Sequence, residues 1–543
     1  MQLIETNQPL VQSQLWQIIR NYYIFKGPSA WTSEETPSFV TNSCYTANYY
    51  AQIIIHALKD FQGQYQEDET PFYILELSSG LGELAFYILS RLEILKKQYQ
   101  IKDIKYCYIL SDVVSQNIDA WQSCEKFKPF LTEKTIDFVY YDINHPEFLE
   151  LQQQGIRLDK DRLTKPLIVI ANYLFDSIPC DVYKTSNSKL LQGMTSLKIP
   201  DDFDIEKPHD LKDLELQIKY QEIATENVYP EPIYNQLLQF YQSNLSSAIF
   251  MLPVAALNYL NFWVRNSSGK LLLLVADKGY SKLEMMQDLD SFHLNYHASL
   301  STLVNFHALE QFFQHQKGEG FYQDRFTSLT SVIYGAGVLF KDLPQLQNFL
   351  QLYSVEMSLQ EYCRLLYQLA YLPNLDAITM LALFRLSKND PIVLRLFYRQ
   401  IANITNPRKL SFNKELNHII EKIRENIYPL SVPEQMNYWL GSIYFAMGEY
   451  HQALEFLKQF KPSEVLIYEY LQKLVECYLQ TNQEEEVRKL LPKIKKARNE
   501  LRLKSLIKKL IDLKLLMRRG LRLLLLILAI AIFIYVIFRN KML

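Results

Sequence analysis

The stretch from Phe72 to Leu92, FYILELSSGLGELAFYILSRL, restricts the fold more than any other part of the chain. It begins with an apolar run that contains a single acid, as in a strand buried on both faces of a parallel sheet. A short turn with two glycines follows, after which Leu84, Ile88 and Leu92 recur at helical spacing. A strand, a glycine turn and a helix in this order place backbone amides against a nucleotide-like ligand. The sequence therefore predicts an α/β fold with a doubly wound, mostly parallel sheet.

Two patterns overlap in the glycine turn. Gly80, Gly82 and Ala85 match the G-x-G-x-x-G/A fingerprint of dinucleotide-binding proteins, which leaves a nicotinamide-dependent oxidoreductase open. Glu76, Ser78, Gly80 and Gly82 resemble the E-x-G-x-G-x-G loop of class I methyltransferases, with serine in place of the first glycine. In that family the acid helps to position the loop and the methionine end of S-adenosylmethionine. A glycine turn alone is weak evidence, so the other strands have to decide.

Four further apolar runs read as strands that end near polar side chains. They are 105–112, 135–143, 166–179 and 270–280. The carboxyl ends of parallel strands meet at one edge of an open α/β sheet, where ligands bind. At that edge Asp112 is suited to accept the hydroxyls of a ribose, and Asp142 lies where methyltransferases commonly contact the adenine amine. One such acid alone is more often a loop residue, but several along one edge predict a binding site.

Together these motifs resemble the MidA-like methyltransferases, a family that includes the mitochondrial complex I assembly factor that methylates a protein arginine. The family motifs A-N-E-x-x-D-A-L-P-V and D-Y-G-Y correspond to ANYLFDSIP at 171–179 and DKGY at 277–280. Further counterparts are FVTNS at 39–43 and VNFHAL at 304–309. The resemblance covers residues 20 to 345. It implies a Rossmann-like fold, S-adenosylmethionine as cofactor and methyl transfer to a protein side chain.

The resemblance also implies two groups of site residues. The cofactor-binding residues would be Glu76, Ser78, Gly80, Gly82, Asp112 and Asp142. Asn172 and Asp176 would be the catalytic residues that orient the methyl acceptor for in-line transfer. Both also have a structural reading, because Asn172 could cap the next helix and Asp176 could hydrogen-bond its own turn. The family's glutamate is Tyr173 here, so a carboxylate suited to an arginine guanidinium is missing.

Outside the strand region the sequence predicts helices. The segment 201–267, between the fourth and fifth predicted strands, is rich in Tyr and Gln and is expected to form a helical insert. The first domain would then span residues 1–345. From residue 346 to 500, Leu, Tyr and Phe recur at helical spacing.

Small residues in the second region follow the pattern of a tetratricopeptide repeat. Gly441, Gly448 and Ala453 lie where paired helices must approach closely, and a shift of 34 residues places Asn482 at the position of Gly448. We therefore expect an all-α domain of such repeats over 346–500 that binds a protein partner. A generic helical bundle is the alternative.

The C-terminal stretch 523–538, LLLLILAIAIFIYVIF, contains no charged residue. As a helix it would be about 24 Å long, slightly shorter than the hydrocarbon core of a bilayer, about 30 Å. The preceding segment 501–522 is rich in Lys and Arg and is expected to be a basic juxtamembrane helix. By the positive-inside rule, the sequence predicts a single C-terminal transmembrane helix with the other domains facing the cytoplasm. A buried core helix is the alternative.

Charge and cysteine content exclude other classes of partner. The 57 basic and 59 acidic residues nearly balance, which is not typical of a nucleic-acid-binding protein. The six cysteines are scattered without a C-x-x-C pair, so neither a zinc site nor a disulfide framework is predicted. The predicted function is a membrane-tethered S-adenosylmethionine-dependent methyltransferase. The alternative is a catalytically inactive adaptor with a methyltransferase fold whose helical repeats carry the function.

Overall fold

The computed structural model describes residues 1–32, 40–101, 104–287, 289, 291–292, 294–323, 325, 327–463 and 466–498. The chain forms two compact units. The first contains Met1–Pro373, Ile378–Leu396 and His418–Val432, and the second contains Asn374–Ala377, Phe397–Asn417 and the chain from Pro433 onward. The predicted domain boundary at residue 345 stays a prediction. Helices that follow this residue belong in part to the first unit.

The first unit is built on a mostly parallel sheet. Its strands, in spatial order, are β16 (Glu319–Tyr322), β17 (Leu329–Ala336), β12 (Leu271–Tyr280), β7 (Leu167–Asn172), β2 (Phe72–Leu77), β3 (Tyr106–Asp112) and β4 (Ile136–Tyr140). Neighbouring strands from β12 to β4 are parallel, whereas β17 runs antiparallel to both β12 and β16. A short strand, β15 (Val304–Asn305), adds to the end of β12. The five strands that the sequence predicts are all present, which confirms the α/β part of the prediction.

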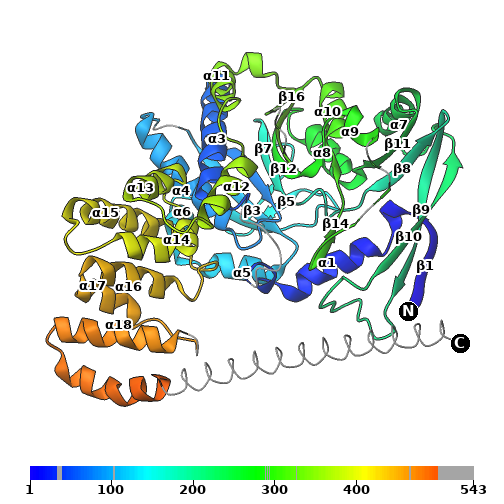
Figure 1. Ribbon diagram of the computed structural model, residues 1–543. Coiled ribbons are helices and arrows are strands. Elements are labelled where there is room, and N and C mark those ends of the chain that lie inside the picture. The colour runs from blue at the N-terminus through cyan, green and yellow to red at the C-terminus, as the bar shows by residue number, and fades with distance from the viewer. Residues whose placement is uncertain are drawn as a thin grey trace, which may run out of the picture. The chain divides into compact units, whose positions relative to one another are not determined.

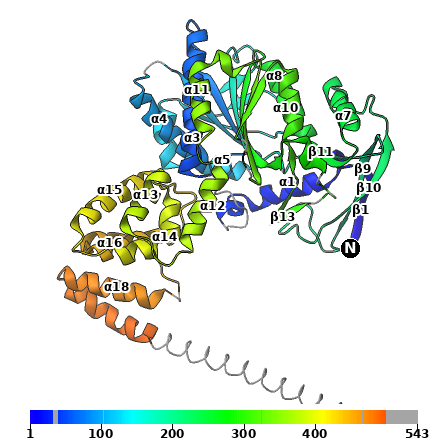
Figure 2. The ribbon, with the colours of Figure 1, turned by 45° about the horizontal axis from the view of Figure 1, so that its top comes forward.

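The sheet strands bury both faces because successive side chains point to opposite sides. In β7, Leu167 and Val169 enter one hydrophobic core, and Ile168 and Ile170 enter the other. Figure 2 shows α3 (Cys44–Gln64) and α11 (Pro344–Tyr353) on one side of the sheet. The other side carries α8 (Val254–Asn266) and α10 (Phe306–His315). Two-sided burial explains why these strands read as continuous apolar runs.

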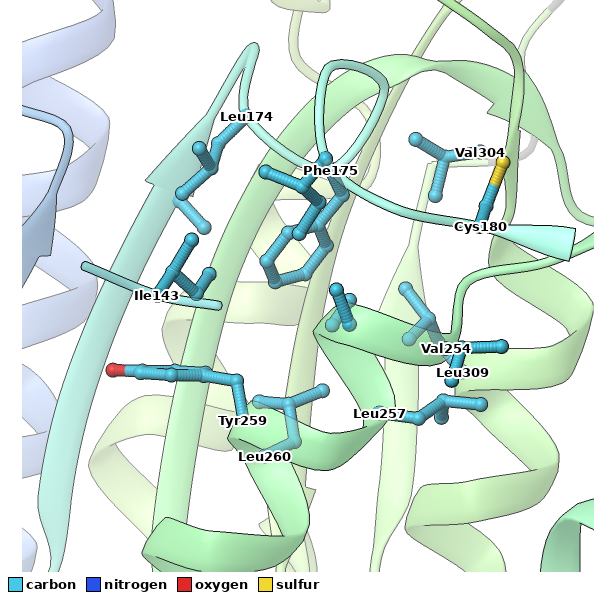
Figure 3. Close-up of a cluster of buried hydrophobic side chains, with 14 of the residues drawn as sticks. Ile143, Leu174, Phe175, Cys180, Val254, Leu257, Tyr259, Leu260, Val304 and Leu309 are labelled. Atoms are coloured by element: carbon cyan, nitrogen blue, oxygen red, sulfur yellow. The ribbon is translucent and has the colours of Figure 1, made fainter. Parts of the chain in front are cut away.

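The turn after β7 is fixed by the core below it. In Figure 3, Leu174 of this turn points toward Ile143, and Phe175 points toward α8, which carries Leu257 and Leu260. All five side chains are at least nine-tenths buried. The backbone after β7 is therefore held in place by apolar packing as well as by hydrogen bonds.

A second sheet of the first unit is antiparallel and lies at the right of Figure 1. It contains β1 (Gln2–Pro9), β9 (Lys189–Ile199), β8 (Asp181–Ser186), β11 (Ser247–Leu252) and β10 (Glu215–Ile223). The segment 201–267 is therefore mixed rather than helical, since it holds two strands, α7 (Pro232–Asn244) and α8. The reason is the alternating sequence of β10, ELQIKYQEI, which suits a half-buried strand and pairs with β9 along its whole length.

The helices after residue 353 are divided between the two units. They are α12 (Leu359–Ala370), α13 (Ala377–Leu386), α14 (Pro391–Ile404), α15 (Leu410–Asn426), α16 (Met436–Met447), α17 (Tyr450–Leu457) and α18 (Ile467–Gln480). In the second unit, Gly448 ends α16 in a left-handed conformation with φ of 82°. A Cβ on Gly441 would lie 2.6 Å from Leu457, so α16 and α17 pack at a glycine. Such close packing agrees with the repeat pattern, and the repeat family stays a prediction.

The predicted membrane anchor is corrected by the structure. No helix in the described part of the chain is long and apolar enough to cross a bilayer. The segments 501–522 and 523–538 lie outside the described residues. The apolar run of the second segment is also shorter than the stretch of about 20 residues that a spanning helix needs. The predictions of a C-terminal transmembrane helix, of the membrane as a partner and of a membrane-anchored location facing the cytoplasm are therefore wrong on the described chain.

Candidate ligand-binding site

A cavity lies at the carboxyl edge of the parallel sheet, where β2 and β7 are neighbours. From this point β3 and β4 follow on one side and β12 on the other, so the strand order reverses here. Residues at the carboxyl ends of four strands line the cavity. They are Ser78 after β2, Asp112 at the end of β3, Asp142 after β4 and Asn172 at the end of β7. The cavity encloses about 850 Å³ including its open mouth. Such a reversal point is the usual ligand site of an open α/β sheet.

The walls of this cavity are mostly apolar. They include Trp16, Ile19, Val113, Val114, Ile143, Leu174, Ile178 and Pro179. Helix α1 (Leu15–Lys26) covers the cavity and supplies the first two of these side chains, together with Arg20 and Tyr23. An apolar pocket with a few polar groups is typical of sites for small organic ligands.

The glycine turn after β2 is held by bonds within the protein. The Gly80 amide donates to Asp112 Oδ2 at 3.0 Å, and the Ser79 amide donates to the Ser111 carbonyl at 2.9 Å. The Gly82 amide donates to the Ser79 carbonyl at 2.8 Å. Ser78, Gly80 and Gly82 all have positive φ, between 49° and 79°. The amides of Gly80 and Gly82, two of the predicted cofactor-binding residues, therefore have partners in the protein.

Two tryptophans pack against the glycines. A Cβ on Gly80 would lie 3.2 Å from Trp31 Cε2, and a Cβ on Gly82 would lie 3.0 Å from Trp121 Nε1. Trp31 belongs to the short helix α2 (Ser29–Thr32), and its ring stacks on Tyr23 with 5.9 Å between ring centroids. A side chain at either position would be strained by the left-handed φ and would require the neighbouring indole ring to shift by a few tenths of an ångström.

A second cavity lies on the other side of Trp31. It encloses about 600 Å³ and is lined by Glu76, Ser79 and Glu83 among others. Both cavities share Trp31, Ser78, Asn172 and Tyr173 in their walls. The space at the sheet edge therefore has two compartments that meet at these four residues.

Glu76 is the penultimate residue of β2, and its carboxyl is buried. Burial raises its pKa to about 8, although the Tyr108 hydroxyl donates to its Oε2 at 2.6 Å. The carboxyl is therefore mostly protonated near neutral pH. Glu83, the first residue of α4 (Glu83–Gln98), is also buried, and its pKa is raised to about 7. The second cavity thus carries less negative charge than its two acids suggest.

We expect Glu76 to make the stability of the protein depend on pH. Between the unfolded pKa of about 4.3 and the folded pKa of about 8, the folded state keeps a proton that the unfolded state loses. Stability therefore falls as pH rises through this window. The substitution Glu76→Gln should remove this pH-dependent loss of stability. Relative to the wild type, its free energy of unfolding should therefore increase by roughly 2 to 4 kcal/mol between pH 5 and pH 8.

Urea denaturation at a series of pH values measures this difference. Exposed Glu67, changed to Gln, is the matched control and should follow the wild-type profile. A Glu76→Gln profile that runs parallel to the wild type from pH 5 to pH 8 would contradict the buried, protonated state of this carboxyl.

Asp112 is committed to bonds within the protein. Its Oδ2 accepts from the Gly80 amide and from Asn117 Nδ2 at 3.1 Å, and its Oδ1 accepts from the Val114 amide at 2.9 Å. Burial raises the pKa of the Asp112 carboxyl to about 6. A carboxylate offers about four acceptor positions, so Asp112 holds the glycine turn and the start of α5 (Ser115–Ser123).

Asp142 lies on the wall of the first cavity beside Arg20. The distance from Arg20 Nε to Asp142 Oδ2 is 3.0 Å, and the side chain of Asp142 is 17% exposed. Its Oδ1 accepts from the Asn144 amide at 3.0 Å. The structure thus brings Asp142 to the predicted cavity, with its charge balanced by a residue that the sequence analysis does not single out.

The two predicted catalytic residues are placed differently. Asn172 lines both cavities, and its Oδ1 accepts from the Tyr50 hydroxyl at 2.8 Å. Its Nδ2 is buried without a partner among the described residues. Asp176 is fully buried and bonds to Ser177, and it is absent from the walls of both cavities. The next element after β7 is the strand β8, so Asn172 caps no helix there.

Asp277, in the second half of β12, organises the turn after β7. Its Oδ2 accepts from the amides of Leu174, Phe175 and Asp176 at 3.1, 2.9 and 3.3 Å. Burial beside Asp176 raises the pKa of the Asp277 carboxyl well above its usual range. Tyr173 begins this turn with a positive φ of 49°, which is strained for a residue with a bulky side chain.

Residues far along the chain, in the same unit, contact the glycine turn. The Tyr428 hydroxyl donates to the Leu81 carbonyl at 2.7 Å, and the Ser431 hydroxyl donates to Glu83 Oε1 at 2.5 Å. The Tyr428 ring stacks on Phe86 of α4 with 5.4 Å between ring centroids. The segment after α15 therefore supports the turn, and its Ser431 also lines the second cavity.

Sequence reasoning missed several residues of the site. They are Arg20, Trp31, Tyr50, Asn117 and Asn144. Only Asn117 carries a signal, because it lies five residues after Asp112 and so falls on the first turn of the following helix. In the described part of the chain, no group of three or more His, Cys, Asp or Glu side chains is arranged to hold a metal ion.

Comparison with known proteins gives only distant likenesses. No family model and no curated protein matches the chain. Among solved structures, an uncharacterized COG1565 superfamily protein from Burkholderia thailandensis has 10% identity and a TM-score of 0.39, over 61% of this chain and 88% of that chain. A COG1565 superfamily member from the same organism, bound to S-adenosyl-homocysteine, has 10% identity and a TM-score of 0.37, over 61% and 89%. These likenesses are too distant to place the chain in a family.

Proposed function

We propose that this protein is an S-adenosylmethionine-dependent methyltransferase that acts on a protein side chain. The observation that carries the proposal is the first cavity, where the exits of four neighbouring parallel strands converge at the reversal of strand order. A mostly parallel sheet with a glycine turn after the strand at that point is also what the resemblance to class I methyltransferases implies. A third support is chemical and comes from the polar atoms of the cavity.

The polar atoms of the first cavity suit the nucleoside part of this cofactor. Asn117, Asn144 and Asn172 line it, and their atoms Asn117 Oδ1, Asn144 Oδ1 and Asn172 Nδ2 are buried without partners among the described residues. Buried polar atoms are normally paired. Two acceptors and one donor without partners therefore suit a ligand that can both donate and accept hydrogen bonds. A nucleoside meets this demand with its amine, hydroxyls and ring nitrogens. The apolar walls would take the face of the base.

When bound, S-adenosylmethionine would supply an electrophilic methyl group. The protein's task would then be to align the acceptor with that group and to exclude water. Asn172 and Tyr173 lie where the two cavities meet, so they are the side chains best placed to position an acceptor entering from the second cavity. Asp176 would act at a distance, by fixing the turn that carries Tyr173.

The proposal is tested by titration calorimetry on the full-length protein, followed by a transfer assay. We expect S-adenosylmethionine and S-adenosyl-homocysteine to bind with dissociation constants in the micromolar range, about −8 kcal/mol, and NAD not to bind. Labelled methyl groups should then pass to proteins in a lysate of the source cell. Binding of NAD alone, or of none of the three, would refute the cofactor assignment.

A catalytically inactive adaptor is the second candidate. It is favoured by Tyr173 at the position of the family's glutamate, by the burial of Asp176 away from both cavities and by Trp31 against Gly80. In this case the helical hairpins of the second unit would bind a protein partner and carry the function. Cofactor binding without methyl transfer in the same assay would favour this candidate.

A further inference from the structure

The side-chain amide of Asn117 donates a hydrogen bond through its nitrogen, whereas its oxygen has no hydrogen-bond partner among the described residues. Asn117 lies on the first turn of α5 and is 1% exposed. Its Nδ2 donates to Asp112 Oδ2 at 3.1 Å. This orientation of the amide follows from chemistry, because an ionised carboxylate only accepts hydrogen bonds. The unused group is therefore an acceptor, on a residue that lines the first cavity.

Asp112, in contrast, already accepts three hydrogen bonds from the protein. The donors are the amides of Gly80 and Val114 and the side chain of Asn117. A carboxylate offers about four acceptor positions, so most of its capacity is in use, and the loss of any of these buried hydrogen bonds would be costly. The carboxylate that the sequence assigns to a ribose therefore mainly holds the protein itself.

We propose that Asn117 Oδ1 accepts the hydrogen bond of a ribose hydroxyl in the first cavity, while Asp112 only positions Asn117. This inference rests on the proposed function and names the residue that reads the sugar. Asp112 fixes the amide by accepting from Nδ2, so that Oδ1 stays available to the ligand. The site would then select for a hydroxyl donor through a neutral amide rather than through a charged carboxylate.

The test is titration calorimetry of the full-length protein with S-adenosyl-homocysteine and its 2′-deoxy and 3′-deoxy analogues. In the wild type, at least one deoxy analogue should bind about tenfold more weakly, as expected for one lost hydrogen bond. In Asn117→Ala, S-adenosyl-homocysteine itself should bind about tenfold more weakly. The further loss on removing the hydroxyl should disappear, because the two changes remove the same bond.

Gln116→Ala is the matched control, since Gln116 is exposed on the same helix and lies outside the cavity walls. It should keep both the affinity and the discrimination of the wild type. Thermal denaturation checks that each variant is folded. If Asn117→Ala is not folded, Asn117→Ser replaces it, because serine is polar but too short to reach the ligand.

The outcomes separate this inference from the proposed function. If Asn117→Ala still discriminates against the deoxy analogues as the wild type does, or if the wild type does not discriminate, Asn117 does not read the ribose. The proposed function survives either result. If the wild type does not bind S-adenosyl-homocysteine, both proposals fail.

Discussion

Replacing Gly80 by aspartate should abolish binding of S-adenosylmethionine, with a loss of at least about 100-fold, or about 3 kcal/mol. Gly80 has a φ of +55°, which costs a residue with a side chain about 1 to 2 kcal/mol. Its new Cβ would lie 3.2 Å from Trp31 Cε2. The added carboxylate would also stand near Asp112, which accepts from the Gly80 amide. The glycine turn would have to move, and the part of the cavity wall that Ser78 forms would move with it.

Gly155→Asp is the matched control for this experiment. Gly155 has a similar φ of +64°, but a Cβ there meets no atom within 4 Å. It therefore carries the same kind of backbone strain without any crowding, and it lies outside the cavity walls. We expect Gly155→Asp to bind S-adenosylmethionine as the wild type does. If Gly80→Asp binds equally well, the glycine turn is not part of the cofactor site.

The second large effect concerns Asp277. The substitution Asp277→Ala removes the acceptor of three buried amides, at Leu174, Phe175 and Asp176. Each unsatisfied buried amide costs about 1 to 3 kcal/mol, so we expect a loss of about 3 to 5 kcal/mol in the free energy of unfolding. Relief of the crowding between the carboxyls of Asp176 and Asp277 offsets part of this cost.

Asp277→Asn is the informative companion variant. Its amide keeps one oxygen that can accept from the same three backbone amides, and it resembles the protonated carboxyl in having no charge. We expect it to lose less than about 1 kcal/mol. Denaturant unfolding at pH 7 measures both variants. Equal losses for alanine and asparagine would show that the carboxyl does not act by accepting from this turn.

The sequence was informative where a local pattern determines the structure. The run before Glu76 is apolar because β2 is buried on both faces, and together with the two glycines and the helical spacing that follow it identifies the strand, the turn and the helix. Asp112 and Asp142 could be placed at one edge of the sheet because parallel strands end together. Both do line the same cavity.

Other features depend on tertiary contacts that no local pattern encodes. Most of the acceptor capacity of Asp112 is used by Asn117 and by backbone amides, which only the folded turn brings together. Trp31 reaches Gly80 from a helix 49 residues away in the sequence. The segment that forms β10 lies within the predicted helical insert. It is a strand because it pairs with β9, a contact that its polar composition does not reveal. An apolar run with a basic segment before it predicted the membrane anchor, which the described chain does not support.

The support of the glycine turn by Tyr428 and Ser431 has a practical consequence for dissecting this protein. The first unit consists of three separate stretches of the chain, because parts of the second unit separate Ile378–Leu396 and His418–Val432 from its main body. No single proteolytic cut can release it intact. A fragment that stops at residue 345 would lack the hydroxyls that hold Leu81 and Glu83. Poor ligand binding by such a fragment would therefore report a damaged turn and not an inactive enzyme.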